Sequence, residues 1–120
     1  MAKILVHITT GPEHPTRAAL GFLVAKAAVE EGHGVSLFLA GDAVQLLRDA
    51  VLDSLNGLGT GSLRESYDAL AAAGARFYVS GLSSKARGLS AADLEGKPAE
   101  FAMPDVLVRL ALDHDRALTY

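Results

Sequence analysis

The most polar short segment of this chain carries residue types that bind small anions. Ser83, Ser84, Lys85 and Arg87 stand within five consecutive positions, shortly after an apolar run that ends at Ser80. Serine hydroxyls and loop backbone N–H groups can hold an oxyanion, and a lysine or arginine supplies the balancing charge. The segment therefore predicts an anion site, with an ordinary polar turn and solvated basic side chains as the alternative. The candidate ligand-binding residues in it are Ser80, Gly81, Ser83, Ser84, Lys85 and Arg87.

A serine at this place also suggests nucleophilic catalysis. A serine nucleophile needs a base that a third group orients. Ser80, His14 and Asp42 would form such a set, since all three are predicted at the same edge of the fold. No Gly-x-Ser-x-Gly surrounds any serine, so the elbow typical of serine hydrolases is missing. A hydrolase or transferase that uses these three residues is the alternative hypothesis.

Other chemically suggestive residues have simpler interpretations. Asp113, His114 and Asp115 are metal-ligand types, but they also fit the polar end of a helix. The glycine-rich segment Asn56–Gly61 lacks the Lys-Ser/Thr pair of a phosphate loop and follows no predicted strand. His7 lies inside an apolar strand, where a core or subunit-contact role is expected. We expect no metal site and no cofactor.

Composition excludes several classes of function. The chain contains no cysteine, which rules out disulfides and thiolate catalysis. Its net charge is −3, and the basic residues are scattered rather than gathered in the stripe that nucleic acids require. No apolar run approaches the roughly 18 residues that cross a membrane, and the first residues lack the apolar segment of a secretory signal. We expect one cytoplasmic domain over residues 1–120, with neither nucleic acid nor membrane as partner.

Strands and helices alternate along the chain, as the changing period of the apolar residues indicates. Strands are predicted at Lys3–Ile8, Val35–Ala40, Arg76–Ser80, Pro98–Ala102 and Ala117–Tyr120. Helices are predicted to begin near Pro15, Asp42, Ser62 and Pro104, with a helical turn at Ser90. This order predicts an α/β fold with a mostly parallel five-stranded sheet covered on both faces, a three-layer α/β/α arrangement of flavodoxin-like architecture.

Finer features of these elements are predicted as well. Asp42, Ser62 and Ser90 each precede an acidic or amide residue by three positions, the spacing of a capping box. Asn56–Gly61 is predicted as a mobile loop and Gly81–Gly88 as a sharp polar turn. The first helix is predicted to face the sheet with Leu20, Leu23, Val24, Ala27 and Ala28, and the last helix with Leu107, Leu110 and Ala111.

One edge of the predicted sheet is the expected binding site. Right-handed crossovers bring the carboxyl ends of parallel strands together, and ligands of such sheets bind there. Glycines that follow the strands let a ligand approach the backbone closely. Helices that begin near Pro15 and Asp42 point their positive ends at the same crevice, although the Asp42 carboxylate opposes an anion. Further candidate ligand-binding residues at this edge are Thr9, Thr10, Gly11, His14, Gly41 and Asp42.

The segment from Arg76 to Leu89 also resembles a known family. It reads Arg-Phe-Tyr-Val-Ser-Gly-Leu-Ser-Ser-Lys-Ala-Arg-Gly-Leu, similar to the DsrE/DsrF-like (YchN-like) proteins, in which a strand runs into a Cys-bearing loop and then an Ala-Arg-Gly-like turn. The opening Lys3–Val6 with Thr9–Gly11, the segment Val35–Gly41 and the ending Asp115–Tyr120 resemble the same family. The resemblance thus covers nearly the whole chain.

The resemblance implies a three-layer α/β/α fold and homo-oligomers, commonly trimers or hexamers. In some members it also implies a sulfur relay through a persulfide on the loop cysteine. The matching positions here are Ser80 and, for members with a second cysteine, Ser83. A serine hydroxyl cannot carry a persulfide, because it is neither a soft nucleophile nor ionised near neutrality. We therefore expect a cysteine-less, non-catalytic DsrE-like subunit that binds a small anionic ligand or serves assembly, without sulfurtransferase activity.

Overall fold

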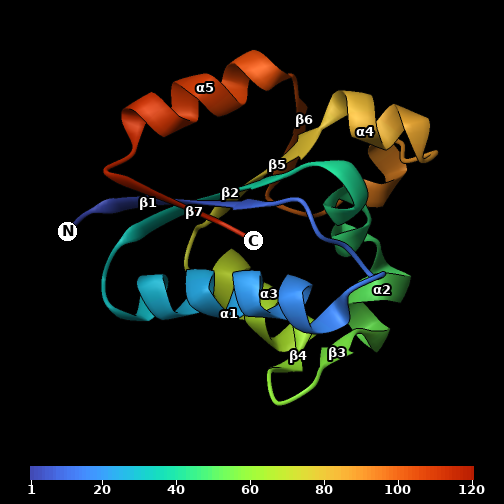
Figure 1. The fold of residues 1–120 in the computed structure, drawn as a ribbon, viewed down its shortest axis with the longest axis horizontal. Coiled ribbons are helices and arrows are strands. Elements are labelled where there is room, and N and C mark those ends of the chain that lie inside the picture. The colour runs from blue at the N-terminus through green and yellow to red at the C-terminus, as the bar shows by residue number, and fades with distance from the viewer.

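Short apolar runs bounded by glycine, proline and polar residues form a five-stranded sheet in which every neighbouring pair is parallel. The computed structural model describes residues 1–120, and Figure 1 shows its layers. The strands lie in the order β6-β5-β2-β1-β7. They are β1 (Lys3–Ile8), β2 (Gly34–Leu39), β5 (Arg76–Ser80), β6 (Ala99–Ala102) and β7 (Arg116–Thr119). The predicted α/β fold is confirmed.

Helices cover the two faces of the sheet unequally. The helices are α1 (Pro15–Glu30), η1 (Gly41–Leu47), α2 (Asp49–Ser54), α3 (Leu63–Ala72), α4 (Gly81–Ala86), η2 (Ala91–Leu94) and α5 (Pro104–Asp113). The chain moves outward from β1 through β2 and β5 to β6, and then returns to place β7 beside β1. Because crossovers are right-handed, this reversal puts α5 on the face opposite α1 and α3 (Figure 1).

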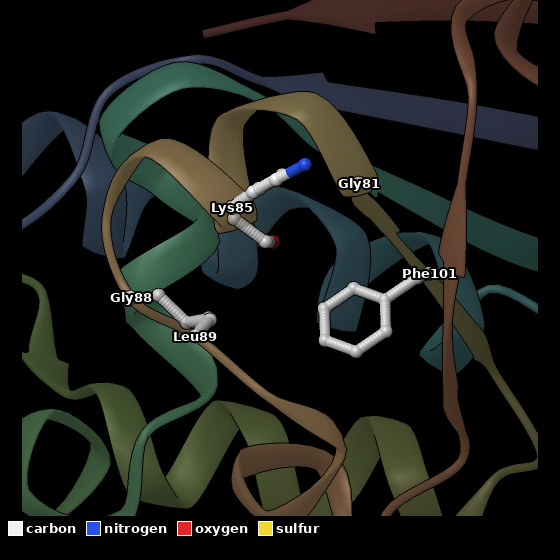
Figure 2. A pocket seen from close by; sticks show the side chains of 6 residues that line it. Gly81, Lys85, Gly88, Leu89 and Phe101 are labelled. Carbon is white, nitrogen blue, oxygen red and sulfur yellow. The ribbon is translucent and has the colours of Figure 1, made fainter.

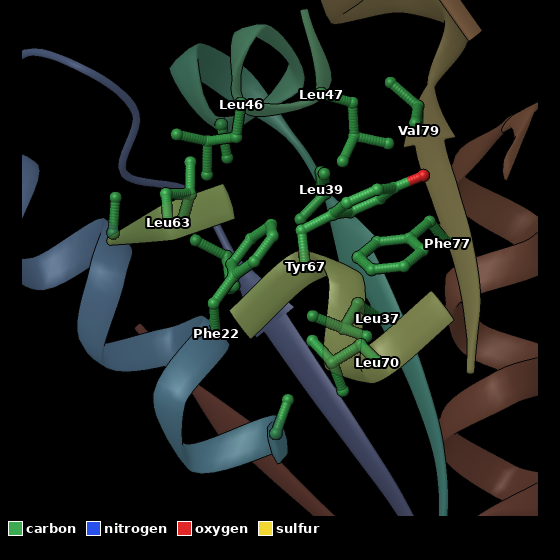
Figure 3. Close-up of a cluster of buried hydrophobic side chains, with 14 of the residues drawn as sticks. Phe22, Leu37, Leu39, Leu46, Leu47, Leu63, Tyr67, Leu70, Phe77 and Val79 are labelled. Carbon is green, nitrogen blue, oxygen red and sulfur yellow. The ribbon is translucent and has the colours of Figure 1, made fainter. Parts of the chain in front are cut away.

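Most of the apolar core lies on the α1 and α3 side. A cluster of 23 buried residues fills this layer. Figure 3 shows Phe22 of α1 and Tyr67 of α3 packed against Phe77 of β5. On the α5 side only Leu5, Phe38 and Ala102 are buried, and no residue of α5 is fully buried. The sheet is therefore anchored from one side and only partly covered on the other.

The structure corrects the predicted buried face of α1. Its buried residues are Ala18, Ala19, Gly21, Phe22 and Ala25, whereas the predicted Leu20 is 38% exposed and the predicted Ala27 is exposed too. Small residues on the true face allow the helix to approach the sheet closely. In α5 the predicted Leu107 and Leu110 are half-buried against the sheet, while Ala111 is exposed.

Two of the three predicted helix caps are confirmed. Ser62 Oγ accepts a hydrogen bond from the Glu65 N–H, and Ser90 forms a capping box with Asp93. Asp42 does not cap its helix, because its carboxylate binds Arg87 instead. The segment that starts there is a 3-10 helix, η1, followed by the short helix α2, rather than one continuous α-helix.

Two predicted loops are regular structure. The segment predicted as a mobile loop contains the antiparallel hairpin of β3 (Asn56–Gly57) and β4 (Gly61–Ser62). The turn is possible because Gly59 and Gly61 have positive φ angles of 78° and 76°. The segment predicted as a polar turn begins with α4, because Ser80 Oγ accepts a hydrogen bond from the Ser83 N–H and so starts a helix at once.

The true face of α1 gives a direct test of this packing. We expect Phe22→Ala to lower the free energy of unfolding by about 3–5 kcal/mol, because Phe22 is fully buried and its loss leaves a cavity. Leu20→Ala, two positions away and partly exposed, should cost less than about 1 kcal/mol. Urea denaturation of both variants measures the difference. Equal losses would show that the helix uses the face with Leu20.

Candidate functional site

Polar residues that follow β5 are fastened to the start of η1 by the chain's own hydrogen bonds. Ser83 Oγ accepts from the Gly41 N–H at 2.9 Å, and Arg87 Nε donates to Asp42 Oδ1 at 2.9 Å. A second guanidinium nitrogen of Arg87 donates to the Ser83 carbonyl at 3.2 Å. The sequence predicts that these four residues meet, and they do, because β2 and β5 are adjacent parallel strands. Their polar groups, however, bind one another.

Ser80 lies at the base of this junction and is not arranged for catalysis. Its side chain caps α4 by accepting from the Ser83 N–H at 3.2 Å, and the residue is 7% exposed. No hydrogen bond joins Ser80 to His14, which is exposed at the start of α1. The third member of the hypothetical set, Asp42, binds Arg87 instead. The base and its orienting carboxylate are therefore not assembled around this serine.

Ser84 and Lys85 differ from their neighbours because no other group of the chain binds the Ser84 hydroxyl or the Lys85 ammonium. Ser84 is 2% exposed, and its hydroxyl is a buried polar group without a hydrogen-bond partner. The exposed Lys85 ammonium makes no ion pair with any carboxylate. Both residues line a cavity of about 410 Å³. We name it the α4 cavity; its lining residues are Gly81, Ser84, Lys85, Gly88, Leu89 and Phe101.

The α4 cavity is open between α4 and the edge strand β6. Figure 2 shows the Phe101 ring of β6 on one side, with Leu89 and Lys85 on the other. Because Ser84 is almost fully buried, it belongs to the floor of this cavity and Lys85 to its rim. Lys85 is the only charged residue among the lining residues. The cavity thus combines apolar walls with one buried hydroxyl and one cation.

A second cavity adjoins the first. We name it the β6 cavity; it has a volume of about 330 Å³ and is lined by Gly81, Phe101, Ala102, Met103, Asp105 and Val106. Gly81 and Phe101 line both cavities. The Asp105 carboxylate is bound by Arg109, whose Nη2 lies 3.0 Å from Oδ2. The β6 cavity is therefore mainly apolar, with its single carboxylate already paired.

The predicted residues after β1 line neither cavity. Thr9 Oγ1 donates to the Tyr120 carbonyl, and the Gly11 N–H donates to Glu13 Oε1. Gly11 must be glycine, because a Cβ there would overlap the Asp42 carbonyl oxygen. Thr10 and His14 lie on the same loop, outside both cavities. This loop packs against η1 and helps to fix it.

Other titratable groups have structural roles. Burial lowers the pKa of His7, whose ring meets Phe38 edge-on with centroids 5.9 Å apart. His114 contacts Ser36 Oγ with Nε2 at 3.1 Å, and the Lys3 ammonium beside Asp113 lowers the pKa of that carboxyl. No group of three or more His, Asp or Glu side chains is arranged to hold a metal ion. None of the helices has both the length and the hydrophobicity to cross a bilayer.

Sequence reasoning missed the apolar half of the two cavities. Gly88, Leu89, Phe101 and Val106 were not predicted as ligand residues, and Met103 was expected only on a loop at the same edge, yet these five are half of the residues that line the two cavities. A signal was present, since the strand predicted at residues 98–102 ends at the same edge as β5. An aromatic residue one position before the end of an edge strand lies near that edge.

The sequence profile of the DsrE/DsrF-like family matches residues 2–120. The chain belongs to the DsrE/DsrF-like family. This confirms the resemblance carried by the segment from Arg76 to Leu89, and the family member described here has no cysteine. No curated protein sequence matches the chain significantly.

Solved structures share the fold at low sequence identity. The ychN protein of E. coli superposes with a TM-score of 0.80 at 19% identity, over 100% of both chains. A protein of unknown function from Methanobacterium thermoautotrophicum gives 0.66 at 16% identity, again over 100% of both chains. One from Bacteroides thetaiotaomicron gives 0.63 at 14% identity, over 99% of this chain and 95% of its own. These similarities show the fold.

Adjacent serines provide a matched test of the hydrogen bonding at this site. Ser83→Ala leaves the Gly41 N–H without its partner, and we expect the free energy of unfolding to fall by about 1–2 kcal/mol. Ser84→Ala removes a buried hydroxyl that has no partner, so we expect stability to rise by up to about 1 kcal/mol. Urea denaturation of the two variants measures the two changes in the free energy of unfolding, which we expect to have opposite signs. A loss of stability in Ser84→Ala as large as in Ser83→Ala would mean that the Ser84 hydroxyl has a partner within the fold.

Proposed function

We propose that this chain is a non-catalytic, ligand-binding subunit of the DsrE/DsrF-like family, related to the sulfur-relay proteins. The proposed ligand is a small anion that binds in the α4 cavity. One observation carries the proposal: Ser84, whose buried hydroxyl has no partner in the chain, and Lys85, whose ammonium makes no ion pair, line the same cavity. Buried polar groups in folded proteins nearly always have a partner, and a bound molecule can supply it.

Electrostatics support an anion rather than a cation. Lys85 is the only charged residue that lines the cavity. The carboxylate of Asp42, which would oppose an anion at this edge, is neutralised by Arg87 at 2.9 Å. The proposed set of ligand-binding residues is therefore smaller than the set that the sequence predicts. Ser84 and Lys85 contact the anion, and Gly81 lines the cavity where it adjoins the β6 cavity. Ser80, Ser83, Gly41, Asp42 and Arg87 bind one another and line no part of either cavity, and neither do Thr9, Thr10, Gly11 and His14.

The proposal excludes sulfur transfer by the chain alone. The positions that the resemblance assigns to cysteines are Ser80 and Ser83, and both hydroxyls accept hydrogen bonds from backbone N–H groups. Neither can form a persulfide. The alternative of a hydrolase lacks the hydrogen bonds that would connect its three residues.

Binding of a small anion can be tested by NMR titration with sulfate, phosphate, acetate and phenylpropanoate. We expect at least one of these anions to shift the amide resonances of residues 81–89. Lys85→Ala should weaken that binding about two- to fivefold, because an exposed ion pair is worth about 0.4–1 kcal/mol. Lys26→Ala is the matched control and should have no effect, because Lys26 belongs to α1 and lines neither cavity. If no anion shifts these resonances, or both variants weaken binding equally, the proposed function is wrong.

We further propose that the chain assembles into a homo-oligomer, a trimer or hexamer as the family resemblance implies. Two elements support this. No residue of α5 is fully buried, and its Val108 and Leu112 are 59% and 82% exposed. All four residues of the edge strand β7 are exposed, including Leu118. Apolar side chains on a partly covered sheet face gain free energy when a second copy covers them.

Sedimentation velocity at micromolar concentration tests the assembly. We expect the mass of a trimer or hexamer, and we expect Leu112→Glu to shift the protein toward the monomer, since a buried charge without a partner opposes association. Leu58→Glu is the matched control, because Leu58 is 91% exposed at the β3–β4 turn, away from α5. A monomeric wild type at this concentration, or equal effects of the two variants, would contradict the proposal.

A further inference from the structure

The two cavities form one continuous surface with an uneven distribution of polar groups. They adjoin at Gly81 and Phe101, which line both. Ser84 and Lys85 line only the α4 cavity, and Asp105 lines only the β6 cavity. The apolar lining residues are Leu89 in the α4 cavity, Ala102, Met103 and Val106 in the β6 cavity, and Phe101 in both. A ligand that occupies both cavities therefore meets a hydroxyl and a cation only in the α4 cavity.

We infer that the ligand is a monocarboxylate with an aromatic or branched apolar body, rather than a small inorganic oxyanion; this rests on the proposed function. The Ser84 hydroxyl is the buried donor for one carboxylate oxygen, and Lys85 supplies the charge. The apolar body lies against the Phe101 ring and Leu89 and reaches toward Met103. A molecule of this kind needs few polar contacts and much apolar contact, which is the ratio that these walls offer.

The polar groups are too few for a strongly hydrated anion. Sulfate or phosphate must exchange a hydration shell for several donors, and desolvation without enough donors costs free energy. The α4 cavity offers one hydroxyl and one exposed ammonium from side chains. A carboxylate on an apolar body loses less hydration, and it gains from the burial of its carbon atoms.

The β6 cavity restricts the ligand to one negative charge. Asp105 is paired with Arg109, and both side chains are largely exposed, at 63% and 68%. The pair offers no free cation to a second carboxylate, and the Asp105 oxygens repel one. The ligand therefore places its single carboxylate at Ser84 and Lys85.

Four probes separate the contributions of charge and apolar body. Phenylpropanoate carries both, acetate only the charge, phenylpropanol only the body, and sulfate is the hydrated inorganic anion. NMR titration of the full chain follows the amides of residues 81–89 and 101–106. We expect phenylpropanoate to bind at least about tenfold more tightly than each of the other three, the effect of about 1.4 kcal/mol from the added contact.

Three variants locate the two ends of the ligand. Ser84→Ala should weaken phenylpropanoate about tenfold, the effect of one hydrogen bond to a charged group. Phe101→Ala should weaken phenylpropanoate and leave acetate unchanged, and Leu82→Ala is its control, since Leu82 is exposed on α4 and lines neither cavity. Gly81→Ala adds a methyl group at the junction, 3.4 Å from Met103 Sδ, and should weaken only the probes that carry an apolar body.

The outcomes distinguish this inference from the proposed function. Suppose that sulfate or acetate binds as tightly as phenylpropanoate, and that Lys85→Ala weakens its binding while Phe101→Ala does not. The proposed function then stands, and the inference on the ligand is overturned. If phenylpropanol binds as tightly as phenylpropanoate, the charge is not recognised, and both the inference and the proposed function are overturned. If none of the anions shifts the amides of residues 81–89, the proposed function fails first. Should Phe101→Ala not fold, Ser84→Ala and Gly81→Ala still decide the matter.

Discussion

Phe77, the second residue of β5, is packed by aromatic rings from two helices. Its ring centroid lies 5.9 Å from that of Phe22 in α1 and 5.3 Å from that of Tyr67 in α3. Such pairs add about 0.5–1.5 kcal/mol to the free energy of burial. This contact holds both helices against β5, which pairs with β2 over four residues. The polar junction and the α4 cavity are built on the ends of these two strands, so their geometry depends on this packing.

The sheet is covered far better on one face than on the other, and this asymmetry has two consequences. The first concerns the β6 cavity, which opens where the end of β6 meets the start of α5. No residue of α5 is fully buried against the sheet there. The second concerns assembly. The same thin cover leaves Val108 and Leu112 exposed, which suits a surface that a second copy completes. The β6 cavity and the exposed apolar residues of α5 therefore both lie on the thinly covered face of the sheet.

The sequence predicted the succession of strands along the chain and their mostly parallel direction, because apolar runs alternate with segments of helical periodicity. The order of the strands within the sheet was not predicted and comes from the structure. The face of α1 was predicted only in part: Ala28 packs against the core, but Leu20 and Ala27 are exposed. Leu20, Phe22 and Leu23 are all apolar, and periodicity alone does not choose between neighbouring apolar sides of a helix. The helical start of residues 81–86 was missed because it depends on one side-chain cap, from Ser80. A tertiary contact also determines the partner of Asp42, because its carboxylate was expected to cap a helix and instead binds Arg87.

Prediction of the site was limited for a related reason. Ser83, Ser84, Lys85 and Arg87 were all predicted as ligand residues from their residue types. Only the structure shows that Ser83 and Arg87 are hydrogen-bonded within the chain, whereas the Ser84 hydroxyl has no partner. Phe101 was missed because an aromatic residue on a short edge strand is ordinary in sequence and informative only when it faces a cavity. Residue type thus identified the loop, while the hydrogen bonds distinguish the side chains that bind within the chain from those that do not.

Serine in place of the family's cysteines changes the loop physically as well as chemically. A thiol is a weak hydrogen-bond acceptor, whereas a hydroxyl is a good one. Here Ser80 Oγ starts α4 by accepting from the Ser83 N–H, and Ser83 Oγ joins α4 to η1 by accepting from the Gly41 N–H at 2.9 Å. Cysteine at either position would weaken these bonds and so loosen the connection between α4 and η1. Serine instead fixes α4, which carries Ser84 and Lys85, against the start of η1.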